Sequence, residues 1–298
     1  MVNRLRGDSM KISFRKKMLF LSLLPLIYSY GLVIYPFASL IYYSFFNYDI
    51  GGTPIFNAGA NYIQLFTDPL FYKSLQLTLS YTVLSVGIEF LLGIMLAYIL
   101  VHILRGRSVA LSILILPLVM TPAVIGIIWR ILFDTAFGHV NFYLGLLGIP
   151  PLKWLIRPTE AFFSTVIVDI WQWTPFVTLV TFAGLTALPV ELVESAYIDG
   201  ASEFRTFKDI LLPRIRALLY IILFLRVVDA LKVFDAVYTM TGGGPGTATN
   251  YLVLFNYLNV MTFYHIGYGC AIAVFIILLM NLIITLLLRR AGPLFFEV

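Results

Sequence analysis

Residues 194–213, ESAYIDGASEFRTFKDILLP, decide the fold, because they form a long polar interruption between two strongly apolar blocks of the chain. Pro189 can open a short helix before them, since a first helical turn does not use the N–H that proline lacks. Gly200 is expected to end this helix after Asp199, as glycine does where the backbone turns at positive φ. Ser202 can cap a second short helix. The pattern predicts a helix–turn–helix, residues 189–213, which we call the polar segment.

The second helix of the polar segment carries a predicted apolar ridge. Phe204, Phe207 and Ile210 follow one another at helical spacing, which indicates that they share a face. Pro213 is expected to end the helix. Basic residues flank the ridge at positions 205, 208, 214 and 216. A helical pair of this kind between two membrane spans is expected to dock into a soluble partner.

The polar segment resembles the cytoplasmic loop of permease subunits in bacterial ABC importers. That loop has the pattern E-A-A, three residues, G, nine residues, I, one residue, L-P. The corresponding positions here are Glu194, Ser195, Ala196, Gly200, Ile210, Leu212 and Pro213, with serine in place of the middle alanine. The alternative is an amphipathic connector that matches the spacing by chance. The resemblance implies that the ATPase contacts come from Glu194, Ser195, Ala196, Asp199, Gly200, Ala201, Phe204, Phe207, Ile210 and Pro213.

The composition is that of a polytopic membrane protein. Of the 298 residues, 60% are hydrophobic and 12% are charged, against about 25% charged in soluble domains. The net charge of +5 comes from clusters beside the apolar segments, so it indicates membrane topology and not nucleic-acid binding. The one cysteine, Cys270, lies in an apolar run and excludes a disulfide framework.

Six apolar segments predict six membrane-spanning helices and an all-α fold. The first follows a basic stretch, residues 1–17, and is expected to remain as an uncleaved span because it is too long for a signal peptide. Pro117 and Pro122 are expected to bend the third span. The loop TGGGPGTATN, residues 241–250, is expected to turn, and a short helix is expected over residues 251–264. The predicted spans cover residues 18–46, 74–104, 109–129, 161–187, 215–238 and 266–288.

The basic residues predict the orientation of the spans, since cytoplasmic loops are enriched in lysine and arginine. Fourteen of the 20 lie in the N-terminal segment, the loop at 105–107, the polar segment with its flank, and the pair at 289–290. Four lie in the segments of the other side. Both termini and the polar segment are therefore expected in the cytoplasm, within one transmembrane domain over residues 1–298.

Other motifs extend the resemblance to carbohydrate-type ABC importer permeases. They are NYIQLFTDP at 61–69, DIWQWTPF at 169–176, VFD at 233–235 and TGGGPG at 241–246. The resemblance implies a second permease subunit, two cytoplasmic ATPase subunits that bind ATP and Mg, and an extracytoplasmic solute-binding protein. It also implies a sugar, polyol or glycerol-phosphate substrate and a place in the bacterial or archaeal cytoplasmic membrane, among lipid.

Ionisable and aromatic residues fall within the predicted spans. The ionisable residues are Glu89, Asp169, Arg226, Asp229, Lys232 and Asp235. Each charge is costly at membrane depth unless it is paired or hydrated. Arg226, Asp229, Lys232 and Asp235 are spaced three apart, so neighbours could pair along a helix. They therefore form either a salt-bridge network or part of a substrate cavity. The candidate substrate-pathway residues are Gln172, Trp173, Asp229, Lys232 and Tyr238, while Tyr257 is expected at the interface.

Two other function classes remain open from the residues alone. An autonomous secondary transporter or channel would carry small polar solutes without an ATPase, but it would have no need of the polar segment. A membrane enzyme is disfavoured, because His102, His139 and His265 are scattered and suggest no metal or acid–base centre. A phosphate-binding glycine loop followed by lysine is also missing from the sequence, so ATP is expected in a partner.

Overall fold

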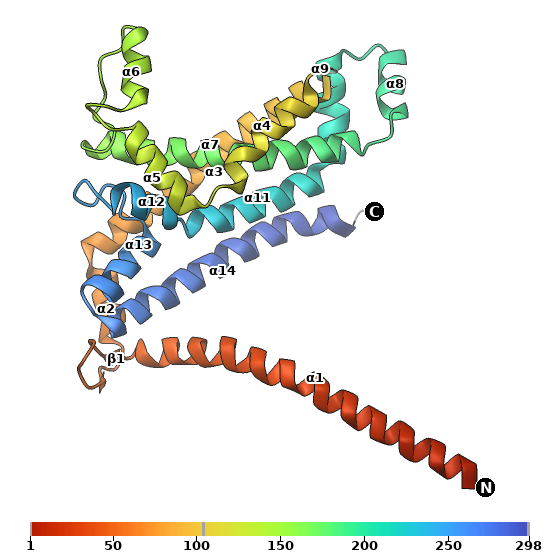
Figure 1. The fold of residues 1–298 in the computed structure, drawn as a ribbon, viewed down its shortest axis with the longest axis vertical. Helices are drawn as coiled ribbons and strands as arrows, with labels where there is room; N and C mark the ends of the chain where they lie inside the picture. The colour runs from red at the N-terminus through yellow and green to blue at the C-terminus, as the bar shows by residue number, and fades with distance from the viewer. Residues whose placement is uncertain (1, 103–104, 297–298) are drawn as a thin grey trace. The chain divides into compact units, whose positions relative to one another are not determined.

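The computed structural model describes residues 2–102 and 105–296, mostly as helices (Figure 1). The chain divides into two compact units. One contains Met1–Thr67 and Asn259–Phe275, and the other contains Asp68–Leu258 and Ile276–Val298. The long C-terminal helix α14, Ile266–Phe296, belongs to the first unit up to Phe275 and to the second unit from Ile276.

The first unit combines a long helix with a small hydrogen-bonded connection. Its elements are α1 (Val2–Tyr43), β1 (Phe46–Asn47), β2 (Ile55–Phe56), α2 (Ala60–Thr67) and η2 (Leu258–Thr262), together with the start of α14. The strands pair antiparallel with Phe46 opposite Phe56. Asn61 Nδ2 donates to the carbonyls of Ser44 and Phe46, both at 2.9 Å. The buried amide thus fixes the turn that follows α1.

The second unit is built on two long helices. These are α3 (Pro69–His102) and α7 (Pro158–Thr186). They approach closely at Gly93, where a Cβ atom would lie 2.6 Å from Val177 Cβ. The helix α11 (Arg216–Leu231) packs against both, with Tyr81, Val166 and Ala230 in one buried apolar cluster.

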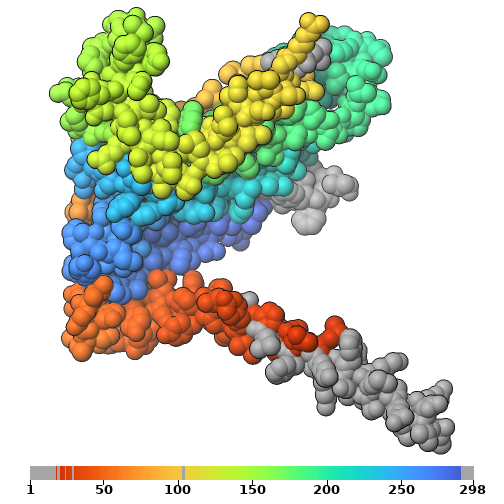
Figure 2. Space-filling view, in the orientation of Figure 1, coloured from red at the N-terminus to blue at the C-terminus, as the bar shows by residue number. Residues whose placement is uncertain are grey.

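The remaining helices of this unit are short. They are α4 (Arg107–Val119), α5 (Pro122–Leu132), α6 (His139–Leu146), α8 (Glu191–Ile198), α9 (Glu203–Arg205), η1 (Thr206–Leu211), α10 (Leu212–Arg214), α12 (Asp235–Thr241) and α13 (Leu252–Tyr257). In the space-filling view α6, in light green, projects from its neighbours (Figure 2). Asp134 orders the turn before α6 by accepting from the amides of Ala136 and Phe137, and these hydrogen bonds lower the pKa of its carboxyl.

Fewer helices are long and apolar enough to span a membrane than the six predicted. Among the described residues there are four, or five if one bent pair forms a single span. The four are Leu21–Tyr43, Pro69–His102, Pro158–Thr186 and Ile266–Arg289. The bent pair is α4 with α5, which meet at 100° across Met120 and Thr121. Pro122 opens α5 there, so the expected proline bend in the third span is present and sharp.

The predicted fifth span, residues 215–238, is not one continuous helix. Its helix α11 has 16 residues and ends at Leu231, and α12 begins at Asp235 after a non-helical Phe234. Asp235 occupies the first turn of α12, where a carboxylate interacts favourably with the helix dipole. The prediction that one helix carries Arg226, Asp229, Lys232 and Asp235 is therefore wrong beyond Leu231, where α11 ends.

The glycine-rich loop and the short helix after it agree with the sequence prediction. Gly242, Gly243 and Gly246 have positive φ, and the peptide bond before Pro245 is cis. Thr249 holds the turn through its hydroxyl, which donates to the carbonyl of Gly244 at 2.8 Å. The helices α13 and η2 then occupy most of residues 251–264.

Candidate functional site

The first helix and the turn of the polar segment agree with the sequence prediction. α8 ends at Ile198, and Gly200 follows with φ of +79° in open surroundings. Ser202 caps the next helix, because its hydroxyl accepts from the amide of Arg205 at 3.4 Å. The predicted glycine turn and serine cap are both confirmed.

The second half of the polar segment differs from the prediction in its helix type. Residues Thr206–Leu211 form the π-helical turn η1, and α10 carries the helix on to Arg214. Pro213 therefore does not end it. The proline lies in the first turn of α10, where the missing N–H is tolerated.

The expected ridge of three apolar side chains is divided between the inside and the surface. Phe207 is buried beside Tyr98 and Ala97, with the Phe207 and Tyr98 ring centroids 4.6 Å apart. Phe204 lies on the surface with 63% of its side chain exposed. Ile210 is half-buried. The single-face prediction was wrong, because each step of three residues rotates an α-helix by about 60° and the π turn alters the spacing further.

Exposed apolar side chains lie on either side of the Gly200 turn in the sequence of the polar segment, and we call this part its tip. Ile198 is 86% exposed, and Tyr197 and Phe204 lie near it in the chain, on either side of the Gly200 turn. Ala196 is instead buried and anchors α8. The remaining predicted contact residues Glu194, Ser195 and Asp199 are exposed, while Ala201 is half-buried. The segment thus has buried anchors at its base and an apolar surface at its tip.

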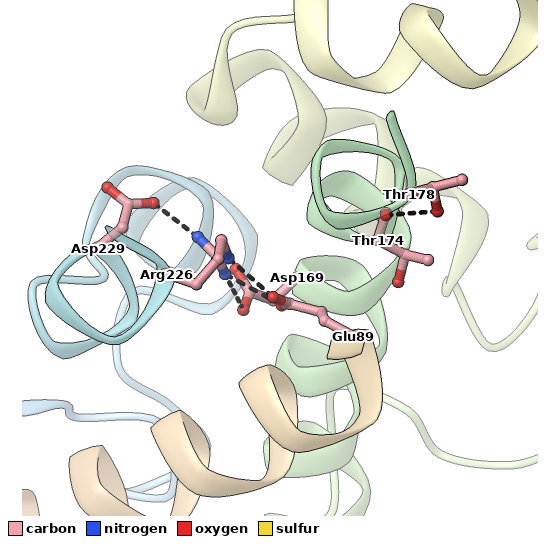
Figure 3. A network of polar contacts seen from close by, with 6 residues as sticks. All are labelled: Glu89, Asp169, Thr174, Thr178, Arg226 and Asp229. Carbon is pink, nitrogen blue, oxygen red and sulfur yellow. Dashed lines mark hydrogen bonds and ion pairs between the residues drawn. The ribbon is translucent and has the colours of Figure 1, made fainter. Parts of the chain in front are cut away.

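A second group of polar residues surrounds Arg226 on α11 (Figure 3). The guanidinium is 1% exposed and donates twice to Glu89 of α3, from Nε at 2.7 Å and from Nη2 at 3.0 Å. Nη2 also donates to Asp169 of α7 at 3.1 Å, and Nη1 donates to Asp229 at 2.9 Å. One cation therefore joins three helices and pairs with three carboxylates.

Asp229 connects this buried cluster to a partly exposed cation. Its Oδ2 accepts from Arg226, while its Oδ1 lies 3.3 Å from Nζ of Lys232. The predicted pairing along α11 is thus confirmed for these three residues. The sequence did not predict that Glu89 and Asp169 would be the buried partners, because residues so distant in the chain give no signal of contact.

Trp173 and Gln172 of α7 lie beside the cluster. The guanidinium carbon of Arg226 is 4.5 Å from the centroid of the Trp173 ring, which is cation–π geometry. One face of the indole is therefore occupied. The Gln172 side chain is 4% exposed and makes no hydrogen bond within residues 2–102 and 105–296.

These residues border a cavity of about 170 Å³. Four of the predicted pathway residues line it, namely Gln172, Trp173, Asp229 and Lys232. The fifth does not belong to the lining: Tyr238 stacks on Phe234 instead, at 5.3 Å between ring centroids. Tyr257, expected at the interface, packs against the same two rings. The sequence prediction missed the other lining residues, including Tyr81, Thr165 and Val233, because ordinary span residues carry no sign of facing a cavity.

The described part of the chain has no group of three or more His, Cys, Asp or Glu side chains arranged to hold a metal ion. Its carboxylates around Arg226 are satisfied by the guanidinium. What the cavity offers is an aromatic surface, an amide and several charged groups. This set of groups is suited to holding a polar solute through hydrogen bonds and contact with a ring.

Comparison with known proteins identifies the family. Residues 89–295 match the family described as "Binding-protein-dependent transport system inner membrane component", and the chain belongs to it. It is 40% identical over 232 residues to the trehalose/maltose transport system permease protein MalF of Thermococcus litoralis, covering 77% of this chain and 78% of the relative. It is 35% identical to the sulfoquinovosyl glycerol transport system permease protein SmoG of Agrobacterium fabrum, covering 82% and 80%.

The fold is also that of a solved transporter. The chain matches a chain in the crystal structure of a bacterial ABC transporter involved in the import of the acidic polysaccharide alginate. The TM-score is 0.82 at 21% identity, with 94% of this chain and 96% of the other covered. The resemblance predicted from the sequence is confirmed: the chain is the membrane component of a binding-protein-dependent transport system.

Proposed function

We propose that this chain forms half of the solute pathway of an ATP-driven sugar importer and works by alternating access. Family membership and the relatives named for sugar transport support the importer class. The observation that carries the proposal is the polar segment, which is anchored at its base by Ala196 and Phe207 and exposes Ile198 and Phe204 at its tip. A carrier that worked alone would have no use for this projecting apolar tip.

In this proposal the polar segment docks onto a cytoplasmic ATPase subunit. Two such subunits bind ATP and Mg and close on each other, and the segment passes their movement to α7 and α11, the helices between which it lies in the chain. A second, homologous permease supplies the other half of the pathway. An extracytoplasmic binding protein delivers the solute to the outer loops.

The proposed topology has six spans with both termini in the cytoplasm. The bent pair α4 and α5 forms the third span, and α11 with α12 forms the fifth. A helix of 16 residues is about 24 Å long and falls short of a hydrocarbon core of about 30 Å. Irregular backbone at membrane depth is tolerated where it lines a cavity, as the turn at Val233 and Phe234 does.

The cavity beside Arg226 is the proposed sugar contact. Asp229 can accept hydrogen bonds from sugar hydroxyls, Gln172 can both accept and donate, and Lys232 can donate. The uncovered part of the Trp173 indole can contact the apolar face of a pyranose ring. Binding there should be weak, since a pathway must release what it accepts.

The test is to change Gly200 in the assembled importer. Gly200 has φ of +79° with nothing within 4 Å of an added Cβ, so a side chain meets backbone strain and no clash. Gly200→Val should leave the chain in the membrane but separate ATP hydrolysis from sugar uptake. The measurements are copurification of the ATPase and uptake per mole of ATP in proteoliposomes.

Gly200→Asn is the matched control, because asparagine adopts the left-handed conformation more readily than valine. It should retain most of the coupling. A second control, Phe204→Ala, shortens the exposed tip without changing the backbone and should weaken ATPase copurification. Two results would overturn the docking role. One is full coupling of ATP hydrolysis to sugar uptake in Gly200→Val, and the other is ATPase copurification that is unchanged in all three variants.

A further inference from the structure

The cavity beside Arg226 carries an excess of negative charge. Asp169, Asp229 and Asp235 line it, and Lys232 is the one cation in its described lining. Behind the lining, Arg226 is matched by the two oxygens of Glu89. The region therefore holds four carboxylates and two cations. One proton shared between Glu89 and Asp169 would still leave an excess of one negative charge.

The two cations are already engaged. The four hydrogen bonds of Arg226 all go to carboxylates, and its side chain is 1% exposed. Trp173 covers the guanidinium from the side. Lys232 faces Asp229 at 3.3 Å. An anionic solute would have to compete with these carboxylates for each cation and would lie close to Asp235, whose carboxylate has no partner among the described residues.

The lining also contains one neutral amide, that of Gln172. Gln172 is 4% exposed and lines the cavity, and its side-chain amide has no hydrogen bond within the described chain. An amide that lines a cavity can bind a ligand hydroxyl through both its oxygen and its nitrogen. The Gln172 amide and the Asp235 carboxylate can both bind hydroxyl groups, so the lining matches a hydroxyl-rich, uncharged molecule.

We infer that this cavity selects uncharged carbohydrates and rejects carbohydrates that carry a phosphate, carboxylate or sulfonate. The inference rests on the proposed sugar pathway and adds a charge filter to it. Like charges close together in a site of reduced dielectric repel strongly, so an acidic sugar loses binding while its neutral parent does not. The residue that sets this preference from the open side is Asp235, since it belongs to no ion pair in the described structure.

The experiment measures sugar binding to the assembled importer without its binding protein, so that selection upstream does not interfere. A cysteine replaces Val233 in the cavity lining, in a Cys270→Ala background. Trehalose, maltose, trehalose 6-phosphate and maltose 1-phosphate then compete with an uncharged maleimide for this site. The labelled chain is read after gel separation from its partners. The neutral sugars should protect the cysteine at concentrations about tenfold or more below those of the phosphates.

Two variants test the origin of the difference. Asp235→Asn should reduce the difference in protecting concentration between each sugar and its phosphate. Asp235→Lys should abolish or reverse that difference. His139→Lys adds a positive charge on exposed α6, outside this cavity, and should change nothing. Equal or tighter protection by the phosphates in the parent protein would overturn the inference.

The failure of the filter is distinguishable from failure of the importer. If no sugar protects the cysteine while the complete importer still takes up sugar, the cavity is not the filter but the proposed function survives. If uptake is also missing with every sugar and binding protein offered, the proposed function fails as well.

Discussion

Arg226 shows how one residue can hold three helices together. Its guanidinium reaches Glu89 on α3, Asp169 on α7 and Asp229 on its own helix, and the first two carboxylates are buried. Removing one partner of a buried ion pair costs about 3–5 kcal/mol, because the other charge is left uncompensated. That is a large share of the 5–15 kcal/mol by which typical domains are stable, as an order of magnitude.

We therefore expect Arg226→Met to lower the membrane abundance of the chain strongly. Lys232→Met is the matched control, since Lys232 is 53% exposed and its pair with Asp229 should contribute only about 0–1 kcal/mol. The measurement is the amount of folded chain in membranes, with thermal unfolding of the purified complex. Equal loss in the two variants would mean that the buried network does not hold the helices.

Asp229 and Trp173 contact both Arg226 and the cavity. Their substitution therefore distinguishes a role in holding the helices together from a role in sugar transport. Asp229→Asn keeps a hydrogen-bond acceptor for Arg226, and Trp173→Ala removes the ring. Both should reduce sugar uptake per folded complex by roughly tenfold, the value of about 1.4 kcal/mol of lost interaction. Abundance and uptake are measured together. Unchanged uptake per folded complex in both variants would place the sugar contact elsewhere.

The sequence predicted the candidate residues better than their arrangement. It singled out every charged member of the network as an ionisable group at membrane depth, because such groups are rare and costly in apolar segments. The pairing of Glu89 with Arg226 depends on how α3 and α11 pack, which local spacing does not encode. The position of Tyr238 outside the cavity lining was not predicted for the same reason: its ring stacks on Phe234, in the break between α11 and α12.

At the scale of elements, the contact between α3 and α7 depends on glycine. A Cβ on Gly93 would lie 2.6 Å from two atoms of Val177, whereas a Cβ on Gly87 of the same helix would meet nothing within 4 Å. Alanine is favoured over glycine inside a helix by roughly 0.5–1 kcal/mol. The two positions should therefore respond to the same substitution in opposite directions.

We expect Gly93→Ala to destabilise the chain by about 1–3 kcal/mol, the usual cost of forcing extra volume into a packed interior. Gly87→Ala should be neutral or slightly stabilising. Thermal unfolding of the purified complex in one detergent checks both. A stabilised Gly93→Ala variant would mean that α3 and α7 do not pack as closely as their backbones indicate.

Turns and helix breaks that are marked by glycine, proline or a capping serine were predicted well. Gly200 and Ser202 fixed the turn of the polar segment, and the prolines fixed the break between α4 and α5, because these residues restrict the backbone locally. The break inside the predicted fifth span was missed, since residues 231–234 contain neither glycine nor proline. The same applies to the π turn η1, which leaves no composition signal.

At the scale of the whole molecule, the distribution of lysine and arginine is the argument for orientation. The basic clusters at the N-terminus, at 105–107, in the polar segment and at 289–290 alternate with segments that contain few cations. Positive charges are retained on the cytoplasmic side of membranes. The polar segment and the glycine-rich loop at 241–250 should therefore lie on opposite sides.

Single cysteines in a Cys270→Ala background test this orientation. Thr247→Cys, in the glycine-rich loop, should react with a membrane-impermeant maleimide added to whole cells, and Ser195→Cys should react only after the membrane is opened. A denaturing detergent then exposes both sites and shows that each cysteine is competent. The asymmetry follows from topology alone, because both positions lie outside the predicted spans. Labelling of Ser195→Cys from outside, with Thr247→Cys protected, would mean that the chain has the opposite orientation in the membrane. The polar segment could then not contact a cytoplasmic ATPase.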